Sequence, residues 1–399
     1  RSLRGLSSLV VQLTCRVAMI VLPGTWVLSG WRQVSACETP RQPDNANNRF
    51  VPSTPTVPSP MHTSSGSTGT ISSGSRLAAA SAGGIVTSSL PSVGVRGGIA
   101  GWNLRWGNVH WEYLLPIFVV HALAGLALLP WCFSWSGLII ALVGTHVFGM
   151  GINLGYHRLL THRSLKVPLW LERTLATIAL CCLEDTPARW VATHRLHHVH
   201  SDEPEDPHTP RDGASWSHVG WLFRRAPDRR TLTFLDKYAR DILADSYFRF
   251  LERHPTSTLW IYLAHAALFA VAGLAVGRIA GGDWAHGVQL GASWLVWGAF
   301  VRTVIVWHMT WSVNSLSHLF GYRTYETGED SRNNWFVAMV AAGEGWHNNH
   351  HHDPASASVQ HQWWEFDLTY YEILLLRQLG LATDIIQPRH VRRAATVRN

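Results

Sequence analysis

The amino-acid sequence predicts an all-α integral membrane protein, and three observations support this. First, 47% of the 399 residues are hydrophobic and only 15% are charged, whereas about a quarter of the residues in soluble domains are charged. Second, several apolar runs approach the length of about 20 residues that a helix needs to cross a bilayer. Third, there are 23 histidines, many of them clustered in the polar segments between those runs. These observations together predict membrane helices that carry a histidine-rich polar cap.

The charge and cysteine content exclude some classes of protein. The formal net charge is +7, but the basic residues are dispersed and gather only in short pairs at 224–225, 229–230 and 392–393. Such pairs favour an anionic membrane surface or anionic substrate headgroups over nucleic acid. The five cysteines form no CxxC pair, so the sequence indicates neither a disulfide framework nor a thiolate metal site.

The first hundred residues differ in composition from the rest. Residues 1–37 include an apolar segment that is signal-like or anchoring. Residues 38–100 are rich in Ser, Thr, Pro and Gly, with very few aromatic residues. Such a segment buries too little apolar surface to fold, so we predict a disordered linker. A folded membrane domain is expected over 101–385, followed by a basic tail at 386–399.

Within the folded domain, we predict four transmembrane helices arranged as two hairpins. A further apolar run at 169–183 spans about 15 residues, which favours a short re-entrant or interfacial helix. The remaining segments, 155–255 and 312–385, are polar and are expected to form a cap. The predicted spans are 113–133, 136–154, 259–277 and 288–306.

The distribution of Lys and Arg predicts the orientation in the membrane. The two hairpin loops, 134–135 and 278–287, contain one Arg between them, whereas the other polar segments contain nearly all the rest. By the positive-inside rule, both termini and the cap are expected in the cytoplasm. Every histidine cluster then lies on the cytoplasmic side.

Three histidine clusters carry the chemistry. Two have the pattern HxxHH, and positions i, i+3 and i+4 share one face of a helix, so each triple can present three imidazoles to a common cavity. In the third, two histidines stand five apart, about 140° around an α-helix at about 100° per residue, which is better suited to two different metals than to one. The clusters are His157 and His162; His194, His197 and His198; and His347, His350 and His351.

A fourth element, Asn314-Ser-Leu-Ser-His318, follows the last apolar run and again places two polar residues on one helix face. His318 offers a ninth imidazole, and the Asn314 amide can hold a metal-bound water. Imidazole sites suit iron, zinc, copper or nickel, so ligand type alone leaves the metal open. Nine ligands exceed the need of one ion, so we expect two metals with open positions for O2 chemistry. Chance enrichment of histidine does not explain three correctly spaced clusters beside this element.

Other polar residues have simpler explanations. Four histidines in apolar runs (His121, His146, His265 and His308) are functional candidates by position, but one helix-to-helix hydrogen bond can satisfy each, so we expect structural roles. Arg302 in the fourth run is expected to line a polar cavity or to extend toward the membrane surface. His200 and His352 are expected to face solvent or to support ligands, and His208 to orient them.

Five segments resemble the stearoyl-CoA (Δ9) desaturase family and occur in that family's order between about Trp102 and Gly380. All ten positions that bear on metal binding carry the residue the family has there. The segments are Gly155-Tyr-His157-Arg-Leu-Leu-Thr-His162, His194-Arg-Leu-His197-His198 with Asp206-Pro-His208, Ser217-His-Val-Gly-Trp-Leu222, Trp311-Ser-Val-Asn314-Ser-Leu-Ser-His318, and Gly343-Glu-Gly-Trp-His347-Asn-Asn-His350-His351.

The resemblance implies a four-helix transmembrane stalk, a cytosolic cap and a non-haem centre of two iron ions. Trp190 and Trp311 would line a bent tunnel for the acyl tail, and no catalytic residue separate from the metal ligands is expected. By motif position the ligands would be His157, His162, His194, His197, His198, His318, His347, His350 and His351, with Asn314 contributing through water.

Two departures from the family affect what the resemblance implies. The animal-type family usually has an acidic residue immediately before its second histidine box, but this chain has Thr193, which puts recognition of the substrate headgroup in doubt. The His-Pro-Gly-Gly haem signature of a fused cytochrome b5 domain is also missing, since His254-Pro255 is followed by Thr256. Electrons would therefore come from a separate donor, such as a cytochrome b5-like protein or a ferredoxin.

The function predicted from the sequence is O2-dependent insertion of a cis double bond, at Δ9, into a saturated acyl thioester such as acyl-CoA. A tunnel that fixes the acyl chain would choose the two carbons. The alternatives are a di-iron lipid hydroxylase, a desaturase of another lipid, and a histidine-rich metal transporter. A transporter, however, needs ionisable residues stacked through the bilayer, whereas these clusters lie at or beyond the helix ends.

Overall fold

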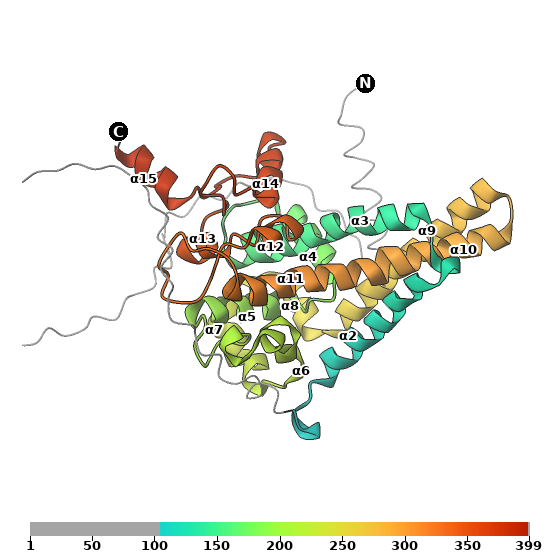
Figure 1. Cartoon of the computed structure of the whole chain (residues 1–399), viewed down its shortest axis with the longest axis horizontal. Helices are drawn as coiled ribbons and strands as arrows, with labels where there is room; N and C mark the ends of the chain where they lie inside the picture. Colours follow the sequence, from blue (N-terminus) through green and yellow to red (C-terminus); the bar gives the residue numbers. More distant parts are fainter. Residues whose placement is uncertain (1–103, 398–399) are drawn as a thin grey trace, which may run out of the picture. The chain divides into compact units, whose positions relative to one another are not determined.

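The computed structural model describes residues 104–397, which are helical without any β-strand; only isolated β-bridges occur (Figure 1). The predicted all-α class is confirmed. The expectations for 1–37 and 38–100 lie outside the described residues. The longer helices are α2 (Trp111–Ala124), α3 (Trp135–Met150), η4 (Gly151–Thr161), α4 (Leu169–Leu180), α5 (Pro187–Val199), α7 (Leu232–Leu243), α8 (Ser246–Arg253), α9 (Thr256–Gly281), α10 (Trp284–Leu295), α11 (Arg302–Leu319), α14 (Leu368–Gln378) and α15 (Arg389–Val397).

Four helical stretches are long and apolar enough to cross a membrane, as predicted, and each overlaps one predicted span. The first ends at Leu128, earlier than expected, because Pro130 begins a separate 3-10 turn, η3 (Pro130–Cys132). The short helix α4 is not among them, in agreement with its predicted length. The four stretches are Trp111–Leu128, Trp135–Thr161, Thr256–Ala280 and Trp284–Leu319.

Glycines allow α9 and α10 to pack backbone to backbone. A Cβ atom added at Gly273 would lie 2.7 Å from the carbonyl oxygen of Leu290, and one added at Gly291 would lie 2.8 Å from that of Ala270. In a bilayer the hydrophobic effect does not drive helices together, so association depends on close packing. Small residues at the contact allow the two helices to approach closely. The helix α2 instead packs against α11 and the π-helical segment η8 (Val296–Val301).

Arg302 is fully buried and does not extend to the membrane surface, so the second of the two alternatives expected for it is wrong. Its Nη1 donates to the carbonyl oxygen of Cys181 at 2.9 Å, and its Nε donates to that of Gly298 at 3.1 Å. Its Nη2 contacts the ring of His265, which also bonds the carbonyl of Tyr262. These contacts satisfy the donors of a buried cation, so Arg302 and His265 join α9, α11 and the end of α4.

The other intramembrane histidines also have partners. His146 pairs with Glu372 of α14 at 2.6 Å, and Nε2 of His121 lies 3.3 Å from Nε2 of His308. These contacts agree with the structural roles expected for all four histidines.

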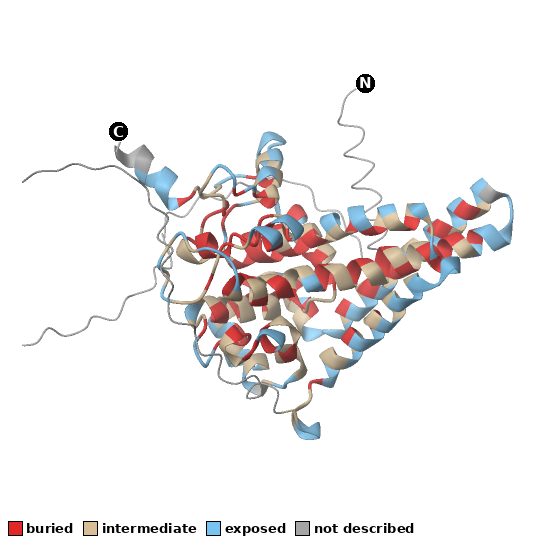
Figure 2. Ribbon diagram, viewed as in Figure 1, coloured by how far each residue is buried: buried red, intermediate tan, exposed pale blue. Residues whose placement is uncertain are grey.

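The polar segments fold against one end of the long helices. α4, α5, α7 and α8 enclose one apolar core with η4, which includes Tyr156, Val191 and Phe248. α14 packs on the other side of η4. Figure 2 shows buried residues concentrated in α5, α11 and α13 (His347–His352), whereas the outer faces of α2, α9 and α10 are exposed. Three of the elements that carry the predicted histidine ligands are therefore held in the packed interior.

Candidate metal centre

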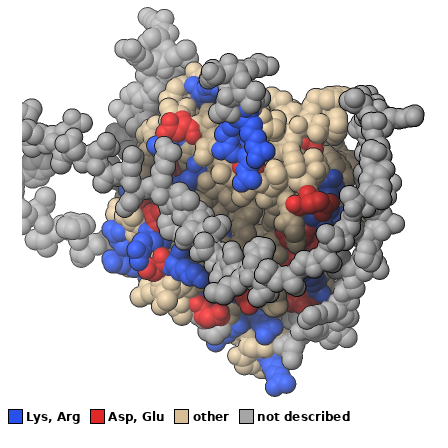
Figure 3. All heavy atoms as spheres, turned by 90° about the vertical axis from the view of Figure 1, so that its left-hand side faces the viewer, with Lys and Arg blue, Asp and Glu red and all other residues tan. Residues whose placement is uncertain are grey.

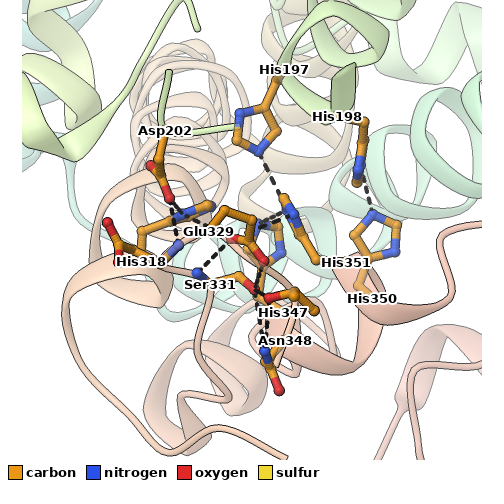
Figure 4. A network of polar contacts seen from close by, with 12 residues as sticks. His197, His198, Asp202, His318, Glu329, Ser331, His347, Asn348, His350 and His351 are labelled. Carbon is orange, nitrogen blue, oxygen red and sulfur yellow. Dashed lines mark hydrogen bonds and ion pairs between the residues drawn. The ribbon is translucent and has the colours of Figure 1, made fainter. Parts of the chain in front are cut away.

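The structure brings all nine predicted histidines into two groups. Within each group, one ligand nitrogen from every ring lies within 4.8 Å of the others. Figure 4 shows side chains from α5, α11 and α13 pointing toward one another. The larger group contains His157, His162, His194, His198 and His350, and the smaller contains His197, His318, His347 and His351.

A π-helix places His157 and His162 in the same group, which corrects the expectation that they serve different metals. The segment η4 is π-helical over Gly151–Thr161, and the amide of His162 donates to the carbonyl of His157 at 3.1 Å. The hydrogen bond from i+5 to i makes each turn wider than in an α-helix, so residues five apart come closer to one face, and the two ring centroids lie 4.8 Å apart. The expectation failed because it assumed regular α-helical pitch.

Each HxxHH cluster is divided between the two groups. On α5, His194 and His198 join the larger group while His197 joins the smaller. On α13, His350 joins the larger group while His347 and His351 join the smaller. Thus α5 and α13 each contribute to both groups, which fixes the two groups side by side.

Buried carboxylates hold three of the rings by their outer nitrogens. The Nδ1 atoms of His157, His197 and His318 lie 2.8, 2.9 and 3.1 Å from carboxylate oxygens. Each ring must then carry its proton on Nδ1, which leaves Nε2 unprotonated and free to bind a metal. The carboxylates are Glu344, Asp206 and Asp202, in that order.

Sequence reasoning assigned no role to Asp202 or Glu344. The available signal was their position, since Asp202 follows the second histidine cluster by four residues and Glu344 precedes the third by three. His208, expected to orient ligands, lies against His197 with ring centroids 4.4 Å apart. His200 pairs instead with the exposed Glu203.

The electrostatics of the centre keep six of its nine imidazoles neutral. Burial, followed by neighbouring histidines, holds the pKa values of six rings well below the ordinary value. Burial alone would raise the pKa of Glu344, but Arg158 and His157 lower it to about 2. Neutral imidazole is the form that binds a metal ion. The six are His162, His194, His198, His347, His350 and His351.

The side chains present fit two metal ions. In the larger group, Nε2 of His350 lies 3.1 Å from Nε2 of His157 and 2.9 Å from Nε2 of His198, so ring nitrogens from η4, α5 and α13 converge. The Nε2 atoms of His162 and His318 are buried without a hydrogen-bond partner. Buried polar atoms are almost always satisfied. A cation bound between the rings would explain why each group contains one such atom.

A cavity of about 500 Å³ adjoins the larger group. The ring of Trp190 forms part of its wall and stacks on His194, with centroids 5.1 Å apart. Trp311 and Asn314, the other two predicted site residues, also line it. Apolar side chains such as Ile117 and Trp307 form further parts of the wall. The cavity can therefore hold an apolar chain beside the histidines.

Glu184 is a buried acid in the wall of this cavity, and sequence reasoning did not single it out. Its carboxylate accepts hydrogen bonds from Thr310 Oγ1 at 2.8 Å and Trp190 Nε1 at 3.2 Å, and no cation pairs with it among the described residues. Burial raises its pKa to about 7 despite both bonds. Glu184 therefore changes charge near neutral pH.

We expect Glu184→Gln to stabilise the protein at pH 8 more than at pH 5. The folded-state pKa lies above the ordinary value, so the stability tied to the neutral acid is present at low pH and is lost as the pH rises through 7. In the glutamine, Oε1 can accept from Trp190 Nε1 and the amide nitrogen can donate to Thr310 Oγ1, without the charge. Thermal unfolding of both proteins across this range tests the expectation, and an equal shift at both pH values would contradict it.

The fold and site define a class, namely helical membrane proteins with a histidine-rich metal centre beside an apolar cavity. A sequence model described as fatty acid desaturase matches residues 129–375, and the chain belongs to the fatty acid desaturase family. It is accordingly a multi-pass membrane oxidoreductase that acts on an acyl substrate with O2 and an electron donor.

Several characterised proteins are similar over most of their length. The sn-1 stearoyl-lipid 9-desaturase of Anabaena variabilis is 40% identical over 279 residues, which is 70% of this chain and 94% of that protein. An acyl-CoA 5-desaturase of Anemone leveillei is 40% identical over 293 residues, 73% of this chain and 84% of that protein. The Delta-9 acyl-lipid desaturase 2 of Arabidopsis thaliana is 36% identical over 304 residues, 74% of this chain and 90% of that protein.

Proposed function

We propose that this desaturase inserts a cis double bond, at Δ9, into a saturated acyl chain carried as a thioester, with acyl-CoA as the substrate. The observation that carries the proposal is the cavity, in which Trp190 and Asn314 lie beside the histidine groups and arginines form another part of the wall. Relatives named as 9-desaturases support the position of the bond.

We further propose that the nine histidines hold two iron ions, with Asn314 contributing through water. Bound iron supplies the redox chemistry that activates O2 and removes hydrogen from two adjacent methylenes. The protein's own part is placement. Glu344, Asp206 and Asp202 hold imidazole protons at Nδ1, and the wall around Trp190 and Trp311 excludes water and fixes which carbons face the histidines.

For orientation, we propose a cytoplasmic active site and cytoplasmic termini, on the distribution of Lys and Arg between the loops. The positive charge near the cavity then lies on the side where acyl-CoA is available.

Two arginines in the cavity wall support the proposal that the substrate has an anionic headgroup. Arg230 pairs with Glu112 and Arg189 with Glu252, but neither Arg224 nor Arg229 forms an ion pair with any described residue. Arg229 is bonded only to the carbonyl of Glu205, at 3.3 Å. Arginines without a carboxylate partner are well suited to bind phosphate groups such as those of coenzyme A.

We expect Arg224→Gln combined with Arg229→Gln to raise the KM for acyl-CoA about tenfold, since two charge-assisted contacts are lost, with a smaller change in kcat. The control is Arg240→Gln, which removes an exposed charge of α7 that does not line the cavity. Steady-state assays at low salt measure both constants. An unchanged KM would argue for a carrier without phosphate near these residues.

The proposed function is tested by expression in a desaturase-deficient host followed by fatty acid profiling. A cis-9 monounsaturated product is expected, and incubation of the purified iron-loaded protein with acyl-CoA, acyl carrier protein thioesters and glycerolipids identifies the carrier. A hydroxylated product would instead indicate the lipid hydroxylase. An unchanged saturated pool in the host, with no product in any assay of the purified protein, would refute the proposal.

A further inference from the structure

A series of aromatic and imidazole rings leads from the surface to the smaller histidine group. The ring of Tyr325 stacks on His352, with centroids 3.7 Å apart and planes within 8°, and His352 directly follows His351 in α13. The hydroxyl of Tyr325 lies 2.9 Å from Nδ1 of His361. The ring of His361 lies 5.0 Å from that of His390, an exposed residue of α15.

Hydrogen bonds hold two of these rings firmly in place. The amide oxygen of Asn348 accepts from the backbone of Tyr325 at 2.8 Å, and its amide nitrogen donates to the carbonyl of Tyr325 at 2.9 Å. A carboxylate oxygen of the buried Glu365 accepts from the backbone of His361 at 2.8 Å. Asn348 belongs to α13 itself, so the ring series is fixed to the helix that carries the histidines.

The outer end of the series lies in a basic surface. The helix α15 begins with Arg389 and His390 and continues through Arg392 and Arg393, all exposed. Among the described residues, the buried Asp353 pairs with Arg389 and with Arg392. Figure 3 faces this end of the molecule and shows Lys and Arg side chains in groups on it, with some acidic residues between them. Positive charge around an exposed ring attracts acidic partners and speeds their encounter.

We propose that α15 is the docking surface for an acidic one-electron carrier protein, and that His390, His361, Tyr325 and His352 are the path by which electrons reach the metal centre. This inference rests on the proposed function. His352 and His361 have no part in the two histidine groups, although one adjoins a proposed ligand and the other bridges to the surface. The rate of electron tunnelling falls steeply as the gap between two groups widens. Rings in contact shorten each gap that an electron has to cross.

The redox balance requires two docking events. One saturated –CH2–CH2– unit, one O2, two electrons and two protons give one –CH=CH– unit and two waters. Each carrier is oxidised by one electron, so two reduced carriers dock in turn. The rings transmit the electrons without being oxidised themselves, and no covalent bond in them changes.

The path is tested by mixing the full-length iron-loaded protein rapidly with a reduced plant-type ferredoxin or a reduced soluble cytochrome b5, and following oxidation of the carrier. Tyr325→Leu, which removes the stacked ring, is expected to slow electron entry several-fold. Tyr325→Phe keeps the ring and loses only the hydroxyl contact to His361, so a smaller effect is expected. Dithionite with a small mediator should drive turnover equally in both variants and the native protein.

The docking surface is tested with Arg389→Gln combined with Arg393→Gln. The second-order rate of carrier oxidation is expected to fall about tenfold at low salt, and the difference from the native protein should vanish at high salt. The matched control is Lys237→Gln combined with Arg240→Gln, which removes the same charge from the exposed face of α7.

The outcomes separate this inference from the function on which it rests. Unchanged rates in Tyr325→Leu and in the Arg389 and Arg393 variant would overturn the path and the surface. Turnover with dithionite but none with either carrier would overturn the acidic partner. If neither source of electrons gives product, the proposed function fails, and the inference fails with it.

Discussion

The variant His198→Ala is expected to lose nearly all desaturation and to bind less iron. Nε2 of His198 lies 3.0 Å from Nε2 of His194 and 2.9 Å from Nε2 of His350, at the middle of the larger histidine group. Changes to residues that only support metal ligands already cost about 10- to 100-fold, so we expect the loss of a ligand to exceed about a hundredfold. Metal analysis and product profiling of the purified protein measure the two effects.

His200→Ala is the matched control for this variant. His200 lies two residues away at the end of α5, but its ring pairs with the exposed Glu203 and belongs to neither group. Its activity and iron content should stay close to those of the native protein. Full iron and full activity in His198→Ala would remove this histidine from the proposed ligand set.

The second large effect is expected from Asp367→Ala, which should destabilise the protein by about 3–5 kcal/mol because it leaves a buried cation half-compensated. The guanidinium of Arg158 is buried and donates from Nη1 and Nη2 to the two oxygens of Asp367, both at 2.8 Å. Asp367 also accepts from the amides of Val359 and Tyr370. Unfolding in denaturant, or failure of the variant to accumulate, reports the loss.

Two comparisons locate the cause of this destabilisation. Asp236→Ala breaks an exposed pair with Arg240 and should have little effect on stability. Asp367→Asn keeps the shape and one hydrogen-bond acceptor but removes the charge, so it should also destabilise the protein strongly. If Asp367→Asn were as stable as the native protein, the ion pair would not be the cause.

The sequence predicted much of the fold because apolar run length and histidine spacing are local signals. Each predicted span overlaps one of the four long apolar helical stretches, and all nine histidines that the structure brings together were named in advance; their role as ligands remains a prediction. Three residues singled out for the cavity and for water-mediated binding (Trp190, Trp311 and Asn314) line the same cavity.

The features that were not predicted depend on contacts between distant parts of the chain. Glu344 bonds His157 across nearly half of the sequence. The burial of Arg302 likewise depends on carbonyls at the end of α4. The π-helical pitch of η4 is local, but nothing in the residue types between the two histidines distinguishes it from an α-helix. Patterns of polarity alone therefore could not predict these contacts, which support the site and the helices around it.

The π-helix η4 has a further consequence for which changes the segment tolerates. It is the count of residues between His157 and His162 that puts their rings on one face, whereas Leu159 and Leu160 between them contribute buried apolar surface. Exchange of either leucine for another aliphatic residue of similar volume preserves the count. An insertion or deletion of a single residue rotates one ring out of its group. The segment therefore tolerates exchanges of residue type at these two leucines but no change in its length.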